Sequence, residues 1–300
     1  MKKKIAVIFL IGIILYFSKF DFASGGELTV VYTANTSGKL KACGCREDPY
    51  GGISERVTLL KNLRSKEEPF LLVDGGNMVN LFGSYDLGAS CVMRIMNLME
   101  YDAAGAGLQE MFHGVNSALK MRDEAKFSLL SATITKNSDG TNVFEPYVIT
   151  RVGENSVVII SVCDSTCLIR NLPPKVNDYS FLPKTDILNN ALREISSKSD
   201  FIVVLSQLSP DENKKMLINF PIIDLIVESN HNKKYDPSVA TPDGVIVSSG
   251  RSGQFIGLIT LEKSKPGKIS IKRHEFLPVL NLPEDKEAHK ICMEYYNSEN

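Results

Sequence analysis

The chain has 300 residues, a hydrophobic content of 43% and almost balanced charge, with 34 basic and 35 acidic residues. This length and apolar content are enough for one large domain or two small ones with a buried core. The balanced charge argues against a nucleic-acid-binding protein and against a polybasic membrane surface. The chain has no tryptophan and only four histidines, which is a thin supply for a metalloenzyme.

The N-terminal segment has the pattern of an export signal. Lysines 2–4 precede an apolar run at residues 5–17, and small residues follow at 23–26. This order is typical of a secretory signal peptide, here within residues 1–25. The alternative is an uncleaved membrane anchor formed by residues 5–17, although a membrane-spanning helix needs roughly 20 apolar residues. In either case we expect a periplasmic or extracellular protein that contacts a membrane only through this segment.

Beyond the export signal, short apolar runs alternate with segments of helical periodicity. We expect helices at 53–63, 91–99 and 187–195 and strands at 28–33, 70–74, 103–106, 127–131, 201–205 and 222–227, with hairpins at 147–152/157–162 and 255–261/269–275. Strands that alternate with helices and then close in antiparallel pairs predict a layered α/β domain. No internal repeat or low-complexity linker divides the chain. We therefore expect a single domain at 26–280 and a C-terminal tail at 281–300.

Several segments carry a family resemblance in their order along the chain. They are LTVVYTANTSG (28–38), GGISERVTLL (51–60), LLVDGGN (71–77), YDAAGAGLQEMFHG (101–114), VVLSQLSPDE (203–212) and DLIVESNHN (224–232). Together they resemble the N-terminal catalytic domain of 5′-nucleotidases and UDP-sugar hydrolases, which belong to the calcineurin-like metallophosphoesterases. The resemblance covers residues 27–278 and implies an α/β/β/α sandwich. It also implies chemistry in which two metal ions activate water against a phosphoester.

The ligand positions implied by this resemblance carry other residues here. Asn35 and Ser37 replace the Asp and His of the Asp-x-His motif, and Asn77 replaces the bridging Asp. Leu108 and Gln109 replace the Asn and His of Gly-Asn-His-Glu, and Gln207 replaces a further His. The closing Gly-His-x-His is replaced by Ser229, Asn230, His231 and Asn232. Amides and hydroxyls are weak ligands for Zn²⁺ or Mn²⁺, and Asp-to-Asn changes remove compensating charge. We therefore expect that no metal cofactor is bound. His231 has two interpretations, a relocated ligand or acid/base group and an ordinary loop residue.

Cysteines follow two of the expected strands. Cys43 and Cys45 lie in a Cys-Gly-Cys motif after the first strand, and Cys163 and Cys167 follow the strand at 157–162. Three interpretations remain open: structural disulfides, expected outside the cytoplasm, thiol redox chemistry, and a four-thiolate metal site. The segment LKACGCREDPYGGISER (40–56) resembles a poorly characterised Cys-Gly-Cys subgroup of UDP-sugar hydrolase-like proteins.

These observations predict a pseudoenzyme with a thiol redox or ligand-binding role. The alternatives are a phosphoric-ester hydrolase of unusual metal usage and a structural or interaction module. The resemblance also implies that a 5′-nucleotidase continues into a second domain that grips the nucleotide base. We expect no such domain here, because the sequence ends where that domain would follow. The sequence predicts no nucleic-acid partner and specifies no other.

Overall fold

We describe the protein from a computed structural model. The structure describes residues 26–42, 49–66, 68–81, 84–165, 176–195, 198–229, 239–241, 244–264 and 268–299. The expected export segment at 1–25 lies outside these ranges. The same is true of Cys43, Cys45, Cys167, Asn230, His231 and Asn232.

The described residues form two six-stranded sheets. The first has the order β14 (Lys268–Pro278), β13 (Phe255–Ser264), β1 (Glu27–Thr33), β2 (Leu71–Asp74), β3 (Ala103–Gly105) and β4 (Ser128–Leu130). Strands β1 to β4 run parallel, while β13 is antiparallel to both β1 and β14. The carboxyl ends of β1, β2 and β3 therefore meet at one edge of the sheet.

The second sheet repeats this plan. Its order is β11 (Val239–Thr241), β12 (Gly244–Val247), β10 (Leu225–Glu228), β9 (Phe201–Ser206), β7 (Asn155–Val162) and β6 (Tyr147–Val152). Strands β12, β10, β9 and β7 are parallel, and antiparallel β11 and β6 close the two edges. A separate two-stranded sheet pairs β5 (Ile134–Lys136) with β8 (Tyr179–Phe181).

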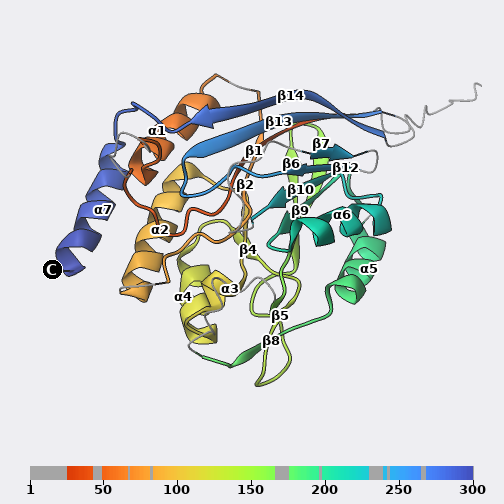
Figure 1. Cartoon of the computed structure of the whole chain (residues 1–300), viewed down its shortest axis with the longest axis horizontal. Helices are drawn as coiled ribbons and strands as arrows, with labels where there is room; N and C mark the ends of the chain where they lie inside the picture. Colours follow the sequence, from red (N-terminus) through yellow and green to blue (C-terminus); the bar gives the residue numbers. More distant parts are fainter. Residues whose placement is uncertain are drawn as a thin grey trace, which may run out of the picture.

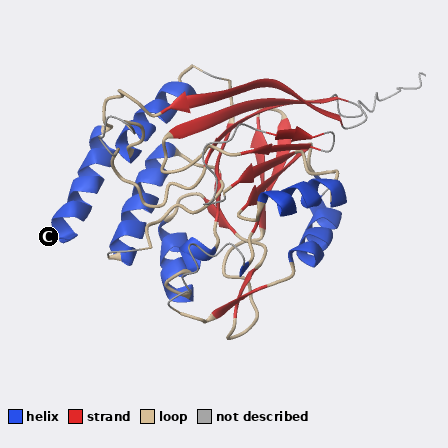
Figure 2. Ribbon diagram, viewed as in Figure 1, coloured by secondary structure: helices blue, strands red, loops and turns tan. Residues whose placement is uncertain are grey.

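The sheets pack face to face, and helices cover both outer faces (Figures 1 and 2). The first sheet carries α1 (Ile53–Arg64), α2 (Tyr85–Met99), α3 (Leu108–Met111), α4 (Val115–Glu124) and α7 (Lys286–Glu299), and the second carries α5 (Lys184–Ile195) and α6 (Pro210–Asn219). Inward side chains of both sheets form the central core layer. The α/β/β/α sandwich predicted from the sequence is confirmed.

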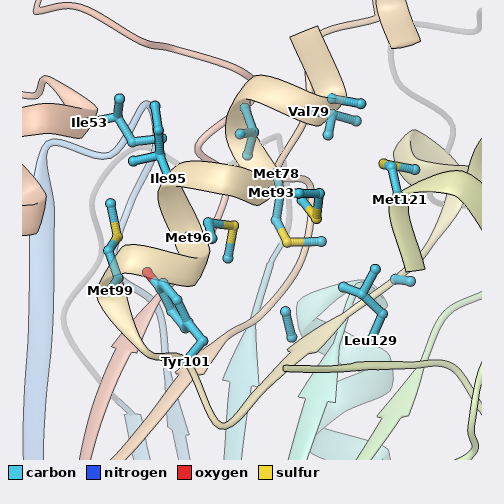
Figure 3. Close-up of a cluster of buried hydrophobic side chains, with 14 of the residues drawn as sticks. Ile53, Met78, Val79, Met93, Ile95, Met96, Met99, Tyr101, Met121 and Leu129 are labelled. Atoms are coloured by element: carbon cyan, nitrogen blue, oxygen red, sulfur yellow. The ribbon is translucent and has the colours of Figure 1, made fainter. Parts of the chain in front are cut away.

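The strands of both sheets are apolar on both faces because they are covered on both sides. In β2, Leu71 and Val73 point to the inter-sheet core, while Leu72 points to the helical layer. This alternation gives parallel strands a continuous apolar sequence. Under the helices, Figure 3 shows Met78, Met93, Met96, Met99 and Met121 gathered beside Ile95, Tyr101 and Leu129. The unbranched methionine side chains fill the irregular gaps between α2, α4 and the sheet.

Two segments differ from the sequence-based expectations. Helix α2 begins at Tyr85, six residues earlier than expected, and its first turns pack their apolar side on the first sheet. The segment 281–300, expected as a tail, contains α7, which packs on α1 and α2 through Ala288, Ile291 and Cys292. Within the described ranges, no helix combines the length and apolar content needed to cross a bilayer.

Candidate functional site

The loops that follow β1 and β2 are joined edge to edge at the carboxyl ends of these strands. The backbone N–H of Asn35 donates to the carbonyl of Gly76 at 2.9 Å, and that of Ser37 to the carbonyl of Asn77 at 2.8 Å. From the loop before β13, the N–H of Ser252 donates to the carbonyl of Asn35 at 2.7 Å. Three chain segments thus meet at Asn35.

This edge has a locally strained backbone. Asn35, Ser37, Asn77 and Ser252 have φ angles of 54°, 51°, 59° and 58°. Non-glycine residues adopt this left-handed region at a cost, and asparagine and aspartate tolerate it better than most. Such conformations persist where surrounding contacts hold them, and they cluster at functional sites. The three inter-loop hydrogen bonds supply those contacts here.

A buried network of neutral polar groups occupies the centre of the edge. The Oδ1 atom of Asn35 accepts hydrogen bonds from Asn77 Nδ2 at 3.0 Å and from Ser229 Oγ at 2.8 Å. Asn35 Nδ2 donates to the carbonyl of Gly250 at 3.1 Å. Asn77 Nδ2 also reaches the carbonyl of Ser229 at 3.1 Å and its Oγ at 3.0 Å. Both asparagines and Ser229 are buried, so the hydrogen bonds replace those to water.

These residues do not fit a dinuclear metal centre. The carbonyl oxygen of Asn35 is engaged by two donors, and the Nδ2 group of Asn77 points its protons at that oxygen and at Ser229. A metal ligand must present a lone pair, which an amide N–H does not. Among the described residues, no carboxylate is hydrogen-bonded to these side chains to offset two divalent cations. Among the residues that the structure describes, no three His, Cys, Asp or Glu side chains cluster in a metal-binding arrangement.

Ser229 is a site residue that sequence reasoning did not single out. It falls at the glycine of the Gly-His-x-His pattern, where the resemblance implies no side chain. Its Oγ lies 2.8 Å from both Asn35 Oδ1 and the carbonyl of Gly76, so it ties the two sheets together at the edge. The signal in the sequence was a serine at the position where the Gly-His-x-His pattern has glycine, which has no side chain beyond a hydrogen atom.

The other substituted positions that the structure describes lie around this network. Gln207, at the end of β9, is buried with its amide against Gly76 and Gly107, where a β-carbon at either glycine would collide with it. Gln109 donates its Nε2 to the carbonyl of Val79, and Leu108 belongs to the apolar core under the helices. Ser37 is half-buried and contributes its backbone.

A buried glutamate preserves the shape of the edge. Glu110 accepts the backbone N–H of Met78 at 2.7 Å and that of Gly107 at 3.0 Å, so it links the loop after β2 to α3. Burial raises the pKa of Glu110, and these backbone hydrogen bonds counteract the rise. The Glu110 carboxylate holds the backbone of these two segments in place and does not face the amide network.

Two further buried charged groups, Asp74 of β2 and Arg56 of α1, lie near this edge. Asp74 accepts Thr33 Oγ1 at 2.5 Å and the N–H of Gly76 at 2.8 Å. Burial raises the pKa of Asp74, while the Thr33 hydrogen bond and the positive charge of Arg56 oppose this rise. Buried Arg56 donates to Thr36 Oγ1 at 2.7 Å and so fixes the loop that carries Asn35.

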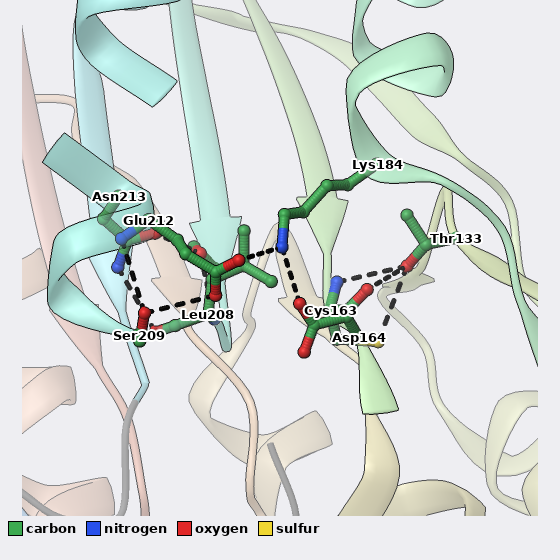
Figure 4. A network of polar contacts seen from close by, with 9 residues as sticks. Thr133, Cys163, Asp164, Lys184, Leu208, Ser209, Glu212 and Asn213 are labelled. Atoms are coloured by element: carbon green, nitrogen blue, oxygen red, sulfur yellow. Dashed lines mark hydrogen bonds and ion pairs between the residues drawn. The ribbon is translucent and has the colours of Figure 1, made fainter. Parts of the chain in front are cut away.

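Of the four candidate cysteines, Cys163 is the one that the described ranges include. It directly follows β7, and its thiol is buried against Thr133 Oγ1 at 3.6 Å and Ser131 Oγ at 3.9 Å (Figure 4). Burial raises the pKa of this thiol to about 12. The next residue, Asp164, is held by Lys184, which also pairs with Glu212 of α6. Cys163 is therefore a protonated thiol in a fixed polar surrounding.

Comparisons with known proteins identify the class of this fold and site. No family model matches the chain. The structure superposes on the NAD nucleotidase NadN of Haemophilus influenzae with a TM-score of 0.76 and 18% identity, covering 92% of this chain and 61% of that one. A 5′-nucleotidase precursor from Thermus thermophilus gives a TM-score of 0.74 and 23% identity, covering 91% and 59%. These likenesses establish the fold.

Curated relatives agree with this class. A snake venom 5′-nucleotidase from Crotalus adamanteus is 26% identical over 225 residues, or 70% of this chain and 38% of that protein. Protein UshA of Escherichia coli is 26% identical over 205 residues, or 65% and 36%. The chain therefore has the calcineurin-like metallophosphoesterase fold and is similar to the N-terminal domain of 5′-nucleotidases, as its motifs predicted. It spans less than two fifths of the length of these two relatives.

The burial of Cys163 predicts slow thiol labelling in the native protein. In the presence of a mild reductant at pH 8, we expect iodoacetamide to modify Cys163 at least about tenfold more slowly in the native chain than in urea, because the reactive species is the thiolate. With a pKa of about 12, protection should persist to pH 10. Fragment-ion mass spectrometry separates Cys163 from Cys167, which shares its tryptic peptide. Rapid native labelling of Cys163 at pH 8 would contradict this placement.

Proposed function

We propose that the chain is an exported, non-hydrolytic relative of the 5′-nucleotidase-like metallophosphoesterases. The observation that carries this proposal is the arrangement of donors around Asn35 Oδ1. Asn77 and Ser229 direct their hydrogen-bond donors at an oxygen that would otherwise face a metal ion. The pocket is thereby filled by its own neutral groups, which leaves no set of lone pairs to bind two cations.

Export is supported by the N-terminal pattern and by the names of relatives. Lysines 2–4 and the apolar run at 5–17 have the order of a secretory signal. The relatives include snake venom proteins and a protein described as a precursor. We propose that residues 1–25 direct the chain out of the cytoplasm, where thiols meet an oxidising environment.

We further propose that thiol exchange by Cys43 and Cys45 is the chemistry that remains at this edge. The described residues on both sides of the Cys-Gly-Cys segment are fixed beside the amide network. The N–H of Ile53 donates to the carbonyl of Leu40 at 3.1 Å, and Gly51 lies against the carbonyl of Ser252. Ser252 in turn bonds to Asn35. The chain segments on both sides of the Cys-Gly-Cys motif are therefore held at the edge where the carboxyl ends of β1 and β2 meet.

A second candidate function is phosphoester hydrolysis with unusual metal usage. It is favoured by the relatives, whose names describe 5′-nucleotidases. This candidate requires a divalent metal at the edge, whereas the non-hydrolytic proposal requires none. Metal content separates the two.

Metal analysis is the direct test of the non-hydrolytic proposal. We expect purified full-length protein, incubated with Zn²⁺ or Mn²⁺ and then desalted, to retain far less than one metal ion per chain. We expect no turnover of adenosine monophosphate or p-nitrophenyl phosphate above the buffer rate, with or without a chelator. About two metal ions per chain, together with turnover that a chelator abolishes, would establish the hydrolase instead.

Restoring one acidic ligand should damage the protein and should not activate it. Asn77→Asp removes the Nδ2 donor and places a carboxylate against Asn35 Oδ1 and the carbonyl of Ser229. We expect a loss of about 1–3 kcal/mol in the free energy of unfolding, measured with urea. The matched control is Asn116→Asp on the exposed face of α4, which should change stability by less than about 0.5 kcal/mol.

The same variant distinguishes the two candidate functions in the presence of metal. The non-hydrolytic proposal predicts that Zn²⁺ and Mn²⁺ leave the unfolding midpoint of Asn77→Asp unchanged, because the other ligands are amides and a hydroxyl. Metal that restores or exceeds wild-type stability of this variant would show that the edge retains a cation site.

Thiol exchange is tested separately. In a glutathione redox buffer, thiol exchange is followed by mass spectrometry on the tryptic peptide 42–46, which carries Cys43 and Cys45 and none of the other cysteines. Cys43→Ser and Cys45→Ser should each slow this exchange by about tenfold or more, because each removes one partner of the pair. Cys163→Ser is the control and should leave the rate unchanged, because that thiol is buried. Unaltered exchange in Cys43→Ser would refute a role for the motif.

A further inference from the structure

Two cysteines outside the proposed site meet at a helix interface. Cys91 lies in α2 and Cys292 in α7, two hundred residues apart in the sequence. Cys91 Sγ lies 3.9 Å from the carbonyl oxygen of Ile291, the residue before Cys292. Each of the two thiols shifts the pKa of the other, which places them close together in this interface. Both are free thiols in the structure and are 3% exposed.

The two helices are already held in a fixed arrangement around this pair. Ile291 and Ala288 of α7 join the core cluster that contains Cys91 and Ile95 of α2. On the solvent side, Arg94 of α2 pairs with Glu294 of α7 at 2.8 Å. On the other side, Ser54 Oγ of α1 lies 3.9 Å from Cys292 Sγ. The two cysteines therefore belong to neighbouring helices in one packed interface, and proximity of this kind is what a disulfide requires.

A cavity of about 220 Å³ reaches Cys91. Cys91, Ile291 and Tyr295 line it, together with polar residues of both helices. The cavity gives a small thiol or disulfide reagent a path to Cys91 that does not require the whole domain to open. Cys163, by contrast, lies against the hydroxyl groups of Ser131 and Thr133.

We infer that Cys91 and Cys292 form a disulfide that fastens the C-terminal helix α7 to α2. The oxidant is a small or protein disulfide, with oxidised glutathione as the model reagent. One cysteine thiolate attacks a sulfur of the oxidant, which gives a mixed disulfide and releases one glutathione thiolate. The second cysteine loses its proton to solvent and attacks the protein sulfur of the mixed disulfide, which releases the second glutathione. The pair loses two electrons and two protons, and oxidised glutathione becomes two thiols.

The surroundings of the pair favour this exchange at neutral pH. Interaction with Cys91 lowers the pKa of Cys292, with burial opposing the shift and Ser54 and His289 assisting it. The same interaction and burial raise the pKa of Cys91. Glu284 and Glu294 are the acidic groups that face the pair, and Arg94 is the further basic one. In this pair Cys292 is therefore the cysteine that forms the thiolate, and the neighbouring Cys91 stays a thiol.

The consequence concerns the mobility of α7. This helix contacts the domain through α1 and α2, and Asp285 caps its first turn by accepting the N–H groups of Glu287 and Ala288 at 3.1 Å. Closing a long loop of chain by a disulfide disfavours open states. In the oxidised protein α7 is locked to the helical layer, and in the reduced protein it opens more often.

Peptide mapping of the full chain tests the bond. Reduced protein is equilibrated with glutathione buffers of increasing oxidised fraction, trapped with acid and maleimide, and digested with trypsin. We expect the peptide 67–94 to be joined to the peptide 291–300, with a mass lower by two hydrogen atoms than the sum of the two. The joined peptide should disappear in Cys91→Ala and in Cys292→Ala and should persist in Cys163→Ala. Separate 67–94 and 291–300 peptides at every buffer ratio, or joining of either to another cysteine, would overturn the inference.

Hydrogen exchange tests the effect on α7 in the wild-type chain, where no variant must fold. We expect the amides of residues 286–299 to exchange about tenfold or more slowly in the oxidised than in the reduced protein. Equal rates would overturn the proposed fastening. The experiment is independent of export and of the amide network, because the oxidant is supplied in solution. Failure of the metal or Cys43→Ser tests would therefore leave this inference intact.

Discussion

The architecture of the candidate site depends on one interaction, the acceptance of two hydrogen bonds by Asn35 Oδ1 from Asn77 and Ser229. It connects the loops after β1 and β2 of the first sheet with the end of β10 in the second. A side-chain oxygen in this position can bind a cation or accept a hydrogen bond, and the neighbouring groups determine which of the two occurs. Here every neighbour supplies N–H or O–H, so the centre is neutral and internally satisfied.

The described hydrogen-bond network at this edge is neutral, while buried charged groups nearby hold its backbone. Glu110 still holds the loop after β2 against α3, and Arg56 still fixes the loop after β1. These groups act on backbone atoms and remain useful without a metal. A buried charge needs partners, and Glu110 finds them in two backbone N–H groups. The left-handed backbone of Asn35 and Asn77 is also independent of metal, because asparagine tolerates it as aspartate does.

The sequence predicted most of the sheets because buried parallel strands are continuous apolar runs, as in 201–205, which became β9. It placed Asn35 and Asn77 at strand ends, where they meet. It did not predict α7, whose half-exposed surface dilutes its apolar spacing, or α3, which is a single turn set by tertiary contacts. The residue type of Ser229 does not by itself indicate a role in the site, because the role of its hydroxyl depends on the two asparagine amides beside it. The family resemblance aligned Gln109 and Gln207 with ligand positions; packing places the Gln109 amide on the carbonyl of Val79 and the Gln207 amide against Gly76 and Gly107.

The cysteines show why residue type alone does not define thiol chemistry. Cys163 lies among hydroxyls in a dry environment, which favours the neutral thiol and resists exchange. Cys91 and Cys292 are equally buried, yet each has the other sulfur as its neighbour, so loss of a proton from one is supported by the other. Burial therefore slows the exchange reactions of an isolated thiol, whereas a buried thiol with a second thiol beside it is favoured to react. The proposed thiol chemistry therefore depends on which cysteines the fold places next to each other.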